Sequence, residues 1–593
     1  MNMMKEIVEA STPAAGAAHI PDSRGINFFT SDPDCAALLR LHLGEARFRT
    51  LEPELRALGL RASDELDRLA SRADKNPPVL QPRTRRGESL ETIDKHPDYV
   101  ALERVAYSEL GLAAMSHRGD APPPLVKYAL TFLFVQAEFG LCCPVSMTDS
   151  LTRTLRRYGS RELVERFLPR LASRDFGVLH QGAMFMTEQA AGSDVGRIAT
   201  RAVRETSADG AATWRLFGDK WFCSNADADL AMVLARPEGA PDGVNGLALF
   251  LLPKTLADGS RNRYRIVRLK DKLGSRSMAS GEIALEGAEA YLIGEIGRGF
   301  HQMADMINMS RLSNGVRAAG LMRRATAEAL HVARHREAFG RKLIDMPLMQ
   351  RQLVKMLVPT EQARSLFMQI AMLLAQADAG DAQAAGCVRI LTPLIKFRAC
   401  RDARRVAGDA MEVRGGTGYI EEWSDARVLR DAHLGSIWEG TSNIVALDVA
   451  RAVKREGALA PLRAFLLDTL DAARLPGASA TRLRRALDRA SDAIAHVAQT
   501  GDDAFVRQSA SALYHAATAI LLASEGMRLA PDHRRLALAH LVLRHKLSPV
   551  DPLATPRADA DANSGALAAL LHDRPVALDD ALRLLDGPSG EAA

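Results

Sequence analysis

Glu439 has the surroundings expected of a catalytic base. It lies between Trp438 and Gly440 in the segment Ile-Trp-Glu-Gly-Thr-Ser-Asn-Ile (437–444), where the neighbouring residues are apolar, small or neutral. Burial in such surroundings raises the pKa of a carboxyl group, as removal of a proton from a carbon atom next to a thioester requires. Taken alone, the segment is more simply explained by a glutamate that caps a helix, so both interpretations stay open here.

A second segment, residues 185–195, combines a turn with short hydrogen-bonding side chains. The turn at Gly192 frees backbone amides beside the hydroxyl groups of Thr187 and Ser193, an arrangement that can hold a flavin edge and a phosphate. An ordinary serine turn is the alternative.

Two more segments suit an aromatic ligand. In residues 218–224, Phe222 could cover one face of a flavin ring while Ser224 reaches its polar edge; two aromatic residues packed in a β core are the alternative. In residues 412–419, a glycine loop lets the backbone approach an adenine or a pyrophosphate, about twenty residues before Glu439.

The elements that must position these segments change in kind along the 593 residues, a length that predicts three or four packed units. Apolar residues three and four apart predict helices in the first part, short alternating runs predict strands in the middle, and helical periodicity then returns. Helices are expected in 34–72, 96–118, 122–175 and 300–455, with breaks at 378–381, Pro393 and 415–418. Strands are expected in 214–224, 230–235, 246–252, 264–269 and 281–285.

These patterns predict a mainly α protein with a central antiparallel, barrel-like β domain. Its expected parts are a helical domain with a flexible arm (1–180), the β domain (181–298), a four-helix bundle (299–455) and a helical extension with a loose acidic tail (456–593). Residues 75–87 are expected to form a long loop. In the extension, Leu459, Leu462, Leu466 and Leu470 lie on one helical stripe, and 576–585 could form a short helix.

Composition excludes several classes of protein. With 47% apolar and 25% charged residues and a net charge of +5, the chain is an ordinary globular protein with a weak preference for anionic partners. The six cysteines have neither metal-ligand nor disulfide spacing, so we expect no metal site and a reducing, cytoplasmic location. No apolar run is long enough for a membrane span, and the first residues do not form a signal peptide.

Five motifs together resemble the acyl-CoA dehydrogenase family. They are Met-Thr-Glu-x-x-x-Gly-Ser-Asp (186–194), Gly-x-Lys-x-Phe-x-Ser (218–224), Arg-x-x-Phe-Gly (336–340), Gly-Gly-x-Gly-Tyr (415–419) and Arg-Asp-Ala-x(4)-Ile-Trp-Glu-Gly-Thr (430–441), in the family's order. The resemblance implies that FAD is the cofactor, that Glu439 removes the α-proton of an acyl-CoA, and that hydride passes from the β-carbon to the flavin and on to an electron acceptor. Acyl chain length and the acceptor stay open.

The resemblance also implies roles for particular residues. Arg336 and Phe339 would reach the FAD of a neighbouring subunit, which makes a homo-oligomer, a tetramer, part of the site. Arg311 and Ser193 would contact the substrate, although Asn308 replaces the aspartate that often precedes the arginine. The residues implied to contact FAD are Met186, Thr187, Gly192, Ser193, Phe222, Cys223, Ser224, Arg336, Phe339, Gly415, Gly416, Trp438, Gly440, Thr441 and Asn443.

Departures from the common family pattern point to one branch of it. Gln189, Pro347, Glu412 and Trp438 replace residues usual in fatty-acid degradation, and they are similar to a branch associated with the response to DNA alkylation. That branch implies a tetramer with weak dehydrogenase activity, and binding of double-stranded DNA attributed partly to the extension.

The sequence itself gives a faint electrostatic indication of DNA binding. Residues 455–550 hold 13 Lys/Arg and nine Asp/Glu, and no helix-turn-helix or zinc-finger signature occurs. Solvated helix faces are the simpler explanation. The arginines proposed for DNA are Arg451, Arg455, Arg482, Arg485 and Arg489, and a further basic cluster is expected at Arg534, Arg535, Arg544 and Lys546.

Overall fold

The computed structural model describes residues 20–206, 212–548, 553 and 565–584. Helices form the amino-terminal part, as the 3.6-residue periodicity predicts. They are α1 (Pro33–Leu43), α2 (Glu45–Ser63), α3 (Glu65–Lys75), α4 (Pro97–Glu103), α5 (Pro124–Phe134), α6 (Cys142–Tyr158) and α7 (Arg161–Leu171). Asp32 caps α1 by accepting a hydrogen bond from the backbone N–H of Cys35.

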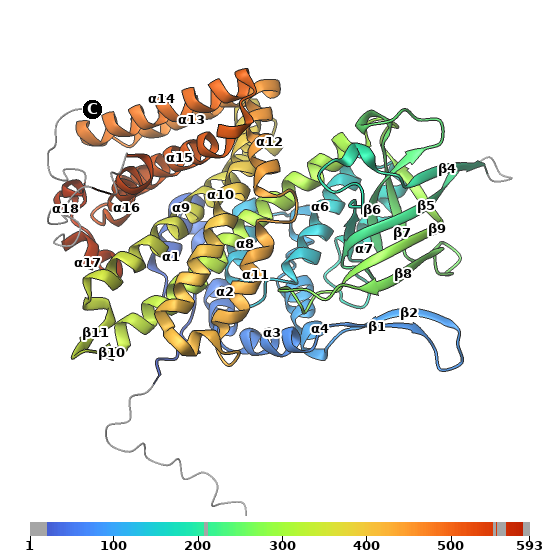
Figure 1. Cartoon of the computed structure of the whole chain (residues 1–593), viewed down its shortest axis with the longest axis horizontal. Helices are drawn as coiled ribbons and strands as arrows, with labels where there is room; N and C mark the ends of the chain where they lie inside the picture. The colour runs from blue at the N-terminus through green and yellow to red at the C-terminus, as the bar shows by residue number, and fades with distance from the viewer. Residues whose placement is uncertain (1–19, 207–211, 549–552, 554–564, 585–593) are drawn as a thin grey trace, which may run out of the picture.

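The expectation of a loop in residues 75–87 is wrong. The chain forms a β-hairpin there, from β1 (Val79–Arg83) and β2 (Ser89–Asp94), which extends along the β domain (Figure 1). The buried carboxylate of Glu91 on β2 accepts a hydrogen bond from the backbone N–H of Ile266 at 3.1 Å. This contact is between distant segments, so local sequence gave no sign of it.

Seven strands form the middle domain: β3 (Gly182–Phe185), β4 (Arg201–Thr206), β5 (Ala212–Ser224), β6 (Leu230–Pro237), β7 (Ala248–Pro253), β8 (Tyr264–Leu269) and β9 (Ser280–Ile293). The order is β3-β6-β4-β5-β9-β7, β8 pairs with β9, and pairing of β6 with β7 closes the sheet. Most pairs are antiparallel, as expected, but β3 and β4 each run parallel to β6.

Strand β6 joins two hydrophobic cores. Leu230, Met232 and Leu234 pack in the core of the helical part, whereas Ala231 and Val233 pack in the core of the β domain. Successive side chains of a strand point to opposite faces, so a fully buried strand has apolar residues at every position. The β domain is therefore packed directly against the helical part of the protein.

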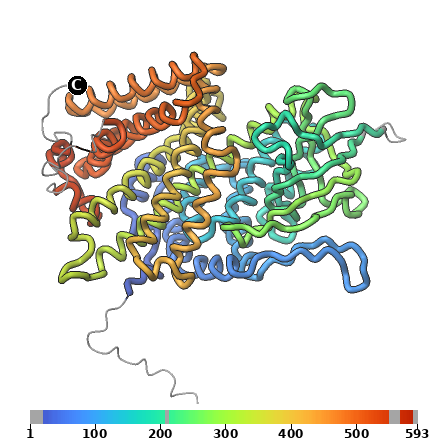
Figure 2. Tube along the Cα trace, viewed as in Figure 1, coloured from blue at the N-terminus to red at the C-terminus, as the bar shows by residue number. Residues whose placement is uncertain are grey.

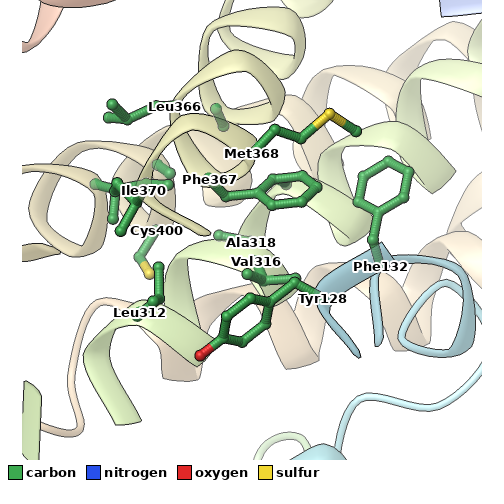
Figure 3. Close-up of a cluster of buried hydrophobic side chains, with 14 of the residues drawn as sticks. Tyr128, Phe132, Leu312, Val316, Ala318, Leu366, Phe367, Met368, Ile370 and Cys400 are labelled. Atoms are coloured by element: carbon green, nitrogen blue, oxygen red, sulfur yellow. The ribbon is translucent and has the colours of Figure 1, made fainter. Parts of the chain in front are cut away.

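Five helices form the bundle: α8 (Gly299–His335), α9 (Pro347–Asp378), α10 (Ala382–Arg414), α11 (Ser424–Gly435) and α12 (Ser442–Glu456). The expected break at 378–381 separates α9 from α10, and α10 ends before Gly415. The break expected at Pro393 is wrong, because α10 continues through it. Figure 3 shows the buried side chains that join α5 to the bundle, where the rings of Phe132 and Phe367 lie 5.5 Å apart.

A two-stranded hairpin, β10 (Glu337–Ala338) and β11 (Arg341–Lys342), connects α8 to α9. The extension consists of α13 (Leu459–Ala472), α14 (Gly477–Thr500), α15 (Val506–Arg528), α16 (Arg534–Val542), α17 (Gly565–Leu571) and α18 (Leu578–Arg583). The predicted short helix corresponds to α18. Residues 549–552, 554–564 and 585–593 of the acidic tail and the arm before residue 20 lie outside the described residues.

The extension shares the hydrophobic core of the bundle. Leu462, Leu466 and Leu470 are buried and Leu459 is partly buried, as the leucine stripe predicts. Figures 1 and 2 show α13 to α16 lying against the bundle on the side away from the β domain. The prediction of a basic cluster is wrong for Arg534 and Arg535, because both residues are buried.

The burial of Arg534 and Arg535 has a structural reason. Arg535 lies 2.9 Å from Glu361 of α9 and 2.6 Å from Glu525 of α15, and Arg534 lies 3.3 Å from Asp573. These ion pairs satisfy charges that would be costly to bury alone, and they attach the extension to the bundle.

Candidate active site

The first two motifs lie side by side in the β domain. The backbone N–H of Trp221 donates to the carbonyl oxygen of Thr187 at 2.8 Å, and Lys220 forms a buried ion pair with Glu188 at 2.7 Å. Glu188 also accepts hydrogen bonds from Ala199 N–H at 2.7 Å and from the Thr200 hydroxyl at 2.5 Å. These bonds fix both ends of the turn that contains Gly192 and Ser193.

Gly192 and Ser193 themselves are exposed. A Cβ added at Gly192 would meet no atom within 4 Å, so the chain's own packing does not require a glycine there. The backbone of this turn is therefore open to a ligand, with the half-buried Met186 and Thr187 at its start.

Phe222 does not belong to a β core, because its side chain is 57% exposed. The ammonium group of Lys270 lies 3.4 Å from the ring centre of Trp221 and 4.9 Å from that of Phe222. Cys223 points the other way and is buried in the core of the β domain, so only its backbone can face a ligand. The half-buried Ser224 follows at the end of β5.

Glu439 occupies a turn between α11 and α12 and does not cap a helix. The residue that caps α12 is Thr441. Glu439 has φ of 56°, a left-handed conformation that is uncommon for a residue with a side chain, and Gly440 follows with φ of 97°. The helix-capping interpretation is therefore excluded.

Two cations hold this turn through its backbone. Arg311 Nε donates to the carbonyl oxygen of Glu439 at 3.1 Å, and the ammonium group of Lys396 donates to the carbonyl oxygen of Gly440. Arg311 is fixed in turn by Asp448 at 2.7 Å, and Asp448 lies 3.0 Å from Arg389. The expected substrate residue Arg311 thus supports the Glu439 turn.

The carboxyl group of Glu439 has surroundings that suit a proton acceptor. Burial raises its pKa, and the charges of Arg311 and Lys396 act in the opposite direction. Its Oε2 atom is buried and has no hydrogen-bond partner among the described residues. The ring of Trp438, the residue before Glu439, stacks on Phe139 with ring centres 5.8 Å apart.

Arg336 lies beside Gly415, away from Glu439, and Phe339 follows Arg336 at the tip of the hairpin between β10 and β11. Arg336 Nη1 donates to the carbonyl oxygen of Arg414 at 2.9 Å, just before Gly415 with its φ of 77°. Eighteen residues of α10 separate Arg414 from Lys396, which corresponds to about 27 Å along a helix. One chain therefore carries two separate groups of the predicted residues.

The extension contacts the Glu439 region directly. Arg507 at the start of α15 donates to the side-chain oxygen of Asn443 at 3.4 Å. Thr441 precedes Asn443 at the amino end of α12 and is exposed, so both are accessible to a ligand phosphate or ring edge.

Sequence reasoning missed several polar residues beside Glu439. Lys396 on α10 and Ser310, Asn314 and Arg317 on α8 are buried in helices whose other buried residues are mostly apolar. In the sequence, the only indication of a functional role is that the residues at positions 310, 314 and 317 are polar but lie on the apolar face of a helix.

Arginines proposed for nucleic acid are exposed on two helices. Arg451 and Arg455 lie on α12, and Arg482, Arg485 and Arg489 lie on α14. Arg451 is 3.2 Å from Asp448.

Other chemistries have little support in the described part of the chain. No group of three His, Cys, Asp or Glu side chains there is placed to hold a metal ion, and all six cysteines are buried and unbridged. Among the described helices, none combines the length and apolar character needed to cross a membrane.

A helical amino-terminal part, a closed β domain and a helical bundle around a carboxylate of raised pKa define an acyl-CoA dehydrogenase-type protein. The comparisons with known proteins agree. Residues 19–177 match the adaptive response protein AidB N-terminal domain, residues 183–288 the acyl-CoA dehydrogenase middle domain, and residues 297–454 the acyl-CoA dehydrogenase C-terminal domain.

Individual relatives give the same result. The chain is 34% identical to acyl-CoA dehydrogenase family member 11 of Caenorhabditis elegans over 72% of this chain and 70% of that protein. It is 35% identical to putative acyl-CoA dehydrogenase AidB of Escherichia coli K12 over 67% and 73%. The structure of C. elegans ACDH-11 in complex with C11-CoA has a TM-score of 0.80 at 29% identity and covers 92% of this chain and 94% of that one.

The chain belongs to the acyl-CoA dehydrogenase family and resembles its AidB-like members. It is an oxidoreductase, and FAD is the cofactor of its family. The residues present fit that cofactor, because the exposed ring of Phe222 and the half-buried Ser224 belong to the strand that bonds through Trp221 to Thr187, at the start of the open turn.

Proposed function

We propose that the protein catalyses α,β-dehydrogenation of an acyl-CoA thioester, with Glu439 as the base that removes the α-proton. The observation that carries this proposal is the carboxyl group of Glu439, whose pKa is raised by burial and whose Oε2 has no partner among the described residues. A general base works best when its pKa approaches the working pH. The C11-CoA complex of a relative supports an acyl-CoA ligand.

The chain's own residues would position and protect the reaction. Glu439 accepts the α-proton at its free oxygen, while Arg311 and Lys396 keep the turn in its left-handed conformation by holding two successive carbonyl groups. Trp438 and Phe139 exclude water from one side of the carboxylate. Bound FAD would supply the hydride acceptor.

FAD would be held by residues of two subunits. Thr187, Ser193, Phe222, Ser224, Thr441 and Asn443 would bind the flavin half in one chain. Arg336, Phe339, Gly415 and Gly416 would bind the adenine half of a neighbour's FAD. The separation of about 27 Å along α10 supports this division. The exposed side chains of Phe339 (95%) and Tyr419 (80%) support a homo-oligomer, as in a tetramer.

The test is anaerobic addition of a panel of acyl-CoA thioesters to the FAD-loaded protein, with flavin absorbance as the readout. The wild type should lose absorbance near 450 nm on a good substrate, as reduced flavins do. Glu439→Gln should retain FAD and thioester binding but show no bleaching. Equal bleaching by Glu439→Gln would overturn the assignment of the base, and no bleaching of the wild type by any thioester would overturn the function.

A second candidate function, binding of double-stranded DNA, is supported by the exposed arginines on α12 and α14. Arg482, Arg485 and Arg489 occupy one exposed face of α14. Neighbouring acids reduce the local charge, since Asp488 pairs with Arg463 and Asp471 with Arg484. If DNA binds there, Arg485→Ala should reduce the salt dependence of binding by about one counterion; an unchanged slope would argue against this surface.

A further inference from the structure

One face of α8 presents buried polar groups to the Glu439 turn. Ser310, Asn314 and Arg317 follow one another at spacings of four and three residues, so they share a side of the helix. Each is only 1% exposed. Both amide atoms of Asn314 and Nη1 of Arg317 have no hydrogen-bond partner among the described residues, whereas the Ser310 hydroxyl lies close enough to the Glu439 carboxyl group to lower its pKa.

Arg317 adjoins the candidate base. Its guanidinium carbon lies 4.8 Å from the ring centre of Trp438, the residue before Glu439, and 5.7 Å from that of Phe139. Its charge lowers the pKa of Glu439, although less than the charges of Arg311 and Lys396 do. The polar face of α8 and the base therefore border the same site.

Other deeply buried arginines of the chain have a carboxylate partner. Arg364, Arg414 and Arg535 are, with Arg317, the largest fully buried side chains, and each of the three lies within 3 Å of a carboxylate oxygen, of Asp32, Asp425 and Glu525 respectively. Arg317 has no ion pair within the described residues, and its Nε reaches only the carbonyl oxygen of Ser313, at 3.3 Å.

An unpaired buried charge is costly, and an isolated buried guanidinium cannot lose its proton. Cation–π contact with Trp438 offsets only part of that cost. A carboxylate on the ligand would complete the site, because it can accept two parallel hydrogen bonds from a guanidinium and a further one from the Asn314 amide. An aliphatic chain end would leave all these groups unsatisfied.

We propose that Arg317 and Asn314 bind a carboxylate at the far end of the acyl group, so that the substrate is the CoA monothioester of a dicarboxylic acid. This inference rests on the proposed dehydrogenase function and specifies its substrate class. Arg317 and Asn314 determine specificity and take no part in the proton or hydride transfer.

The experiment compares thioesters of matched length with four to eight carbons in the acyl group. Each diacid monothioester is paired with the monocarboxylic thioester and with the neutral methyl ester of the diacid. Binding is measured on FAD-loaded Glu439→Gln protein by calorimetry, so that affinity is obtained without turnover, and flavin bleaching is measured on the wild type.

At the best length, the diacid thioester should bind at least tenfold more tightly than both uncharged analogues. Arg317→Met in the Glu439→Gln background should abolish this preference, Arg317→Lys should keep part of it, and Asn314→Leu should weaken it. Arg161→Met, which removes an exposed charge on α7, is the control and should change nothing. Thermal unfolding and FAD content establish that each variant is folded; if Arg317→Met fails to fold, Arg317→Lys and Asn314→Leu carry the test.

Equal or tighter binding of the uncharged thioesters, a preference that survives loss of Arg317, or a preference unchanged by loss of Asn314 would overturn this inference. In that case, bleaching of the wild type by a monocarboxylic thioester would leave the proposed dehydrogenase function standing. Failure of every thioester to bind and to bleach the flavin would remove both.

Discussion

Arg311 Nε lies 3.1 Å from the carbonyl oxygen of Glu439, and Arg311 Nη1 lies 2.7 Å from Asp448. The arginine of α8 thus connects the turn that carries the base to α12, which begins just after that turn. The contact uses the backbone of Glu439 and leaves its carboxyl group free. A strained turn of this kind persists only when its surroundings hold it, and Lys396 provides the second attachment.

Lys396→Met should shift the pH dependence of flavin reduction. Burial lowers the pKa of Lys396 to about 8, so it is mostly charged at neutral pH, and its charge lowers the pKa of Glu439. Removing the charge raises the pKa of the base, and the acid limb of the rate profile should move to higher pH. A shift of one pH unit would reduce the rate on that limb roughly tenfold.

The control for this prediction is Lys396→Arg, which keeps a cation beside the turn. It should leave the acid limb nearly in place, even if the rate falls at all pH values. If the rate of flavin reduction by Lys396→Met falls equally at all pH values and the acid limb does not move, Lys396 acts by position alone.

Breaking the buried Glu188–Lys220 pair should destabilise the loop that contains Thr187. The side chain of Lys220 is fully buried, and the pair is 2.7 Å apart. Lys220→Met leaves the Glu188 carboxylate buried without its counterion, which costs about 3–5 kcal/mol. Thermal unfolding should show a clear loss of stability for Lys220→Met, and its FAD content should fall as well.

The matched comparison is the exposed pair of Arg201 and Glu238, 3.3 Å apart. Arg201→Met should change the free energy of unfolding by less than about 1 kcal/mol, because exposed ion pairs contribute little. Similar losses for the two substitutions would contradict the structural role given to Lys220.

Asp431 should make stability depend on pH. Burial raises its pKa to about 7, while its Oδ1 accepts a hydrogen bond from the backbone N–H of Ser275 at 2.6 Å. The folded state therefore binds a proton that the unfolded state releases near pH 3.8. Stability from this group is present at low pH and is lost as pH rises from about 4 towards 7.

Asp431→Asn keeps the acceptor for Ser275 but cannot ionise. Its free energy of unfolding, measured from pH 5 to 8, should decline less than that of the wild type. The neighbouring buried carboxyl of Glu138, whose pKa is also raised by burial, remains in both proteins. Parallel curves would show that Asp431 is not the titrating group.

Phe339→Ser should weaken FAD binding and subunit association together. The Phe339 side chain is 95% exposed at the tip of the hairpin between β10 and β11, although its φ of 53° is unfavourable for a bulky residue. A neighbouring subunit that covers the Phe339 ring would explain why an apolar residue occupies this exposed position. Light scattering and the ratio of flavin to protein absorbance measure the two effects, and Leu553→Ser, at another exposed apolar residue (91%), is the control.

The sequence alone determined much of the local structure and indicated Glu439 as the candidate base. Apolar and alternating runs located β5 to β9 but not β1, β2 or β4. The 3.6-residue patterns located the helices, and the small residues around Glu439 indicated a tight turn near apolar surfaces. These signals depend on neighbours in the chain, so they can be read without the fold.

Only the tertiary structure decided which charges are buried and which residues meet. Arg534 and Arg535 look like a surface cluster in the sequence, but α1, α9 and α15 cover them with matching acids. Lys396 and Arg317 look like ordinary helical residues, yet they border Glu439 because α8 and α10 pack around its turn. Burial and pairing depend on which distant element covers a given face, and local sequence does not contain that information.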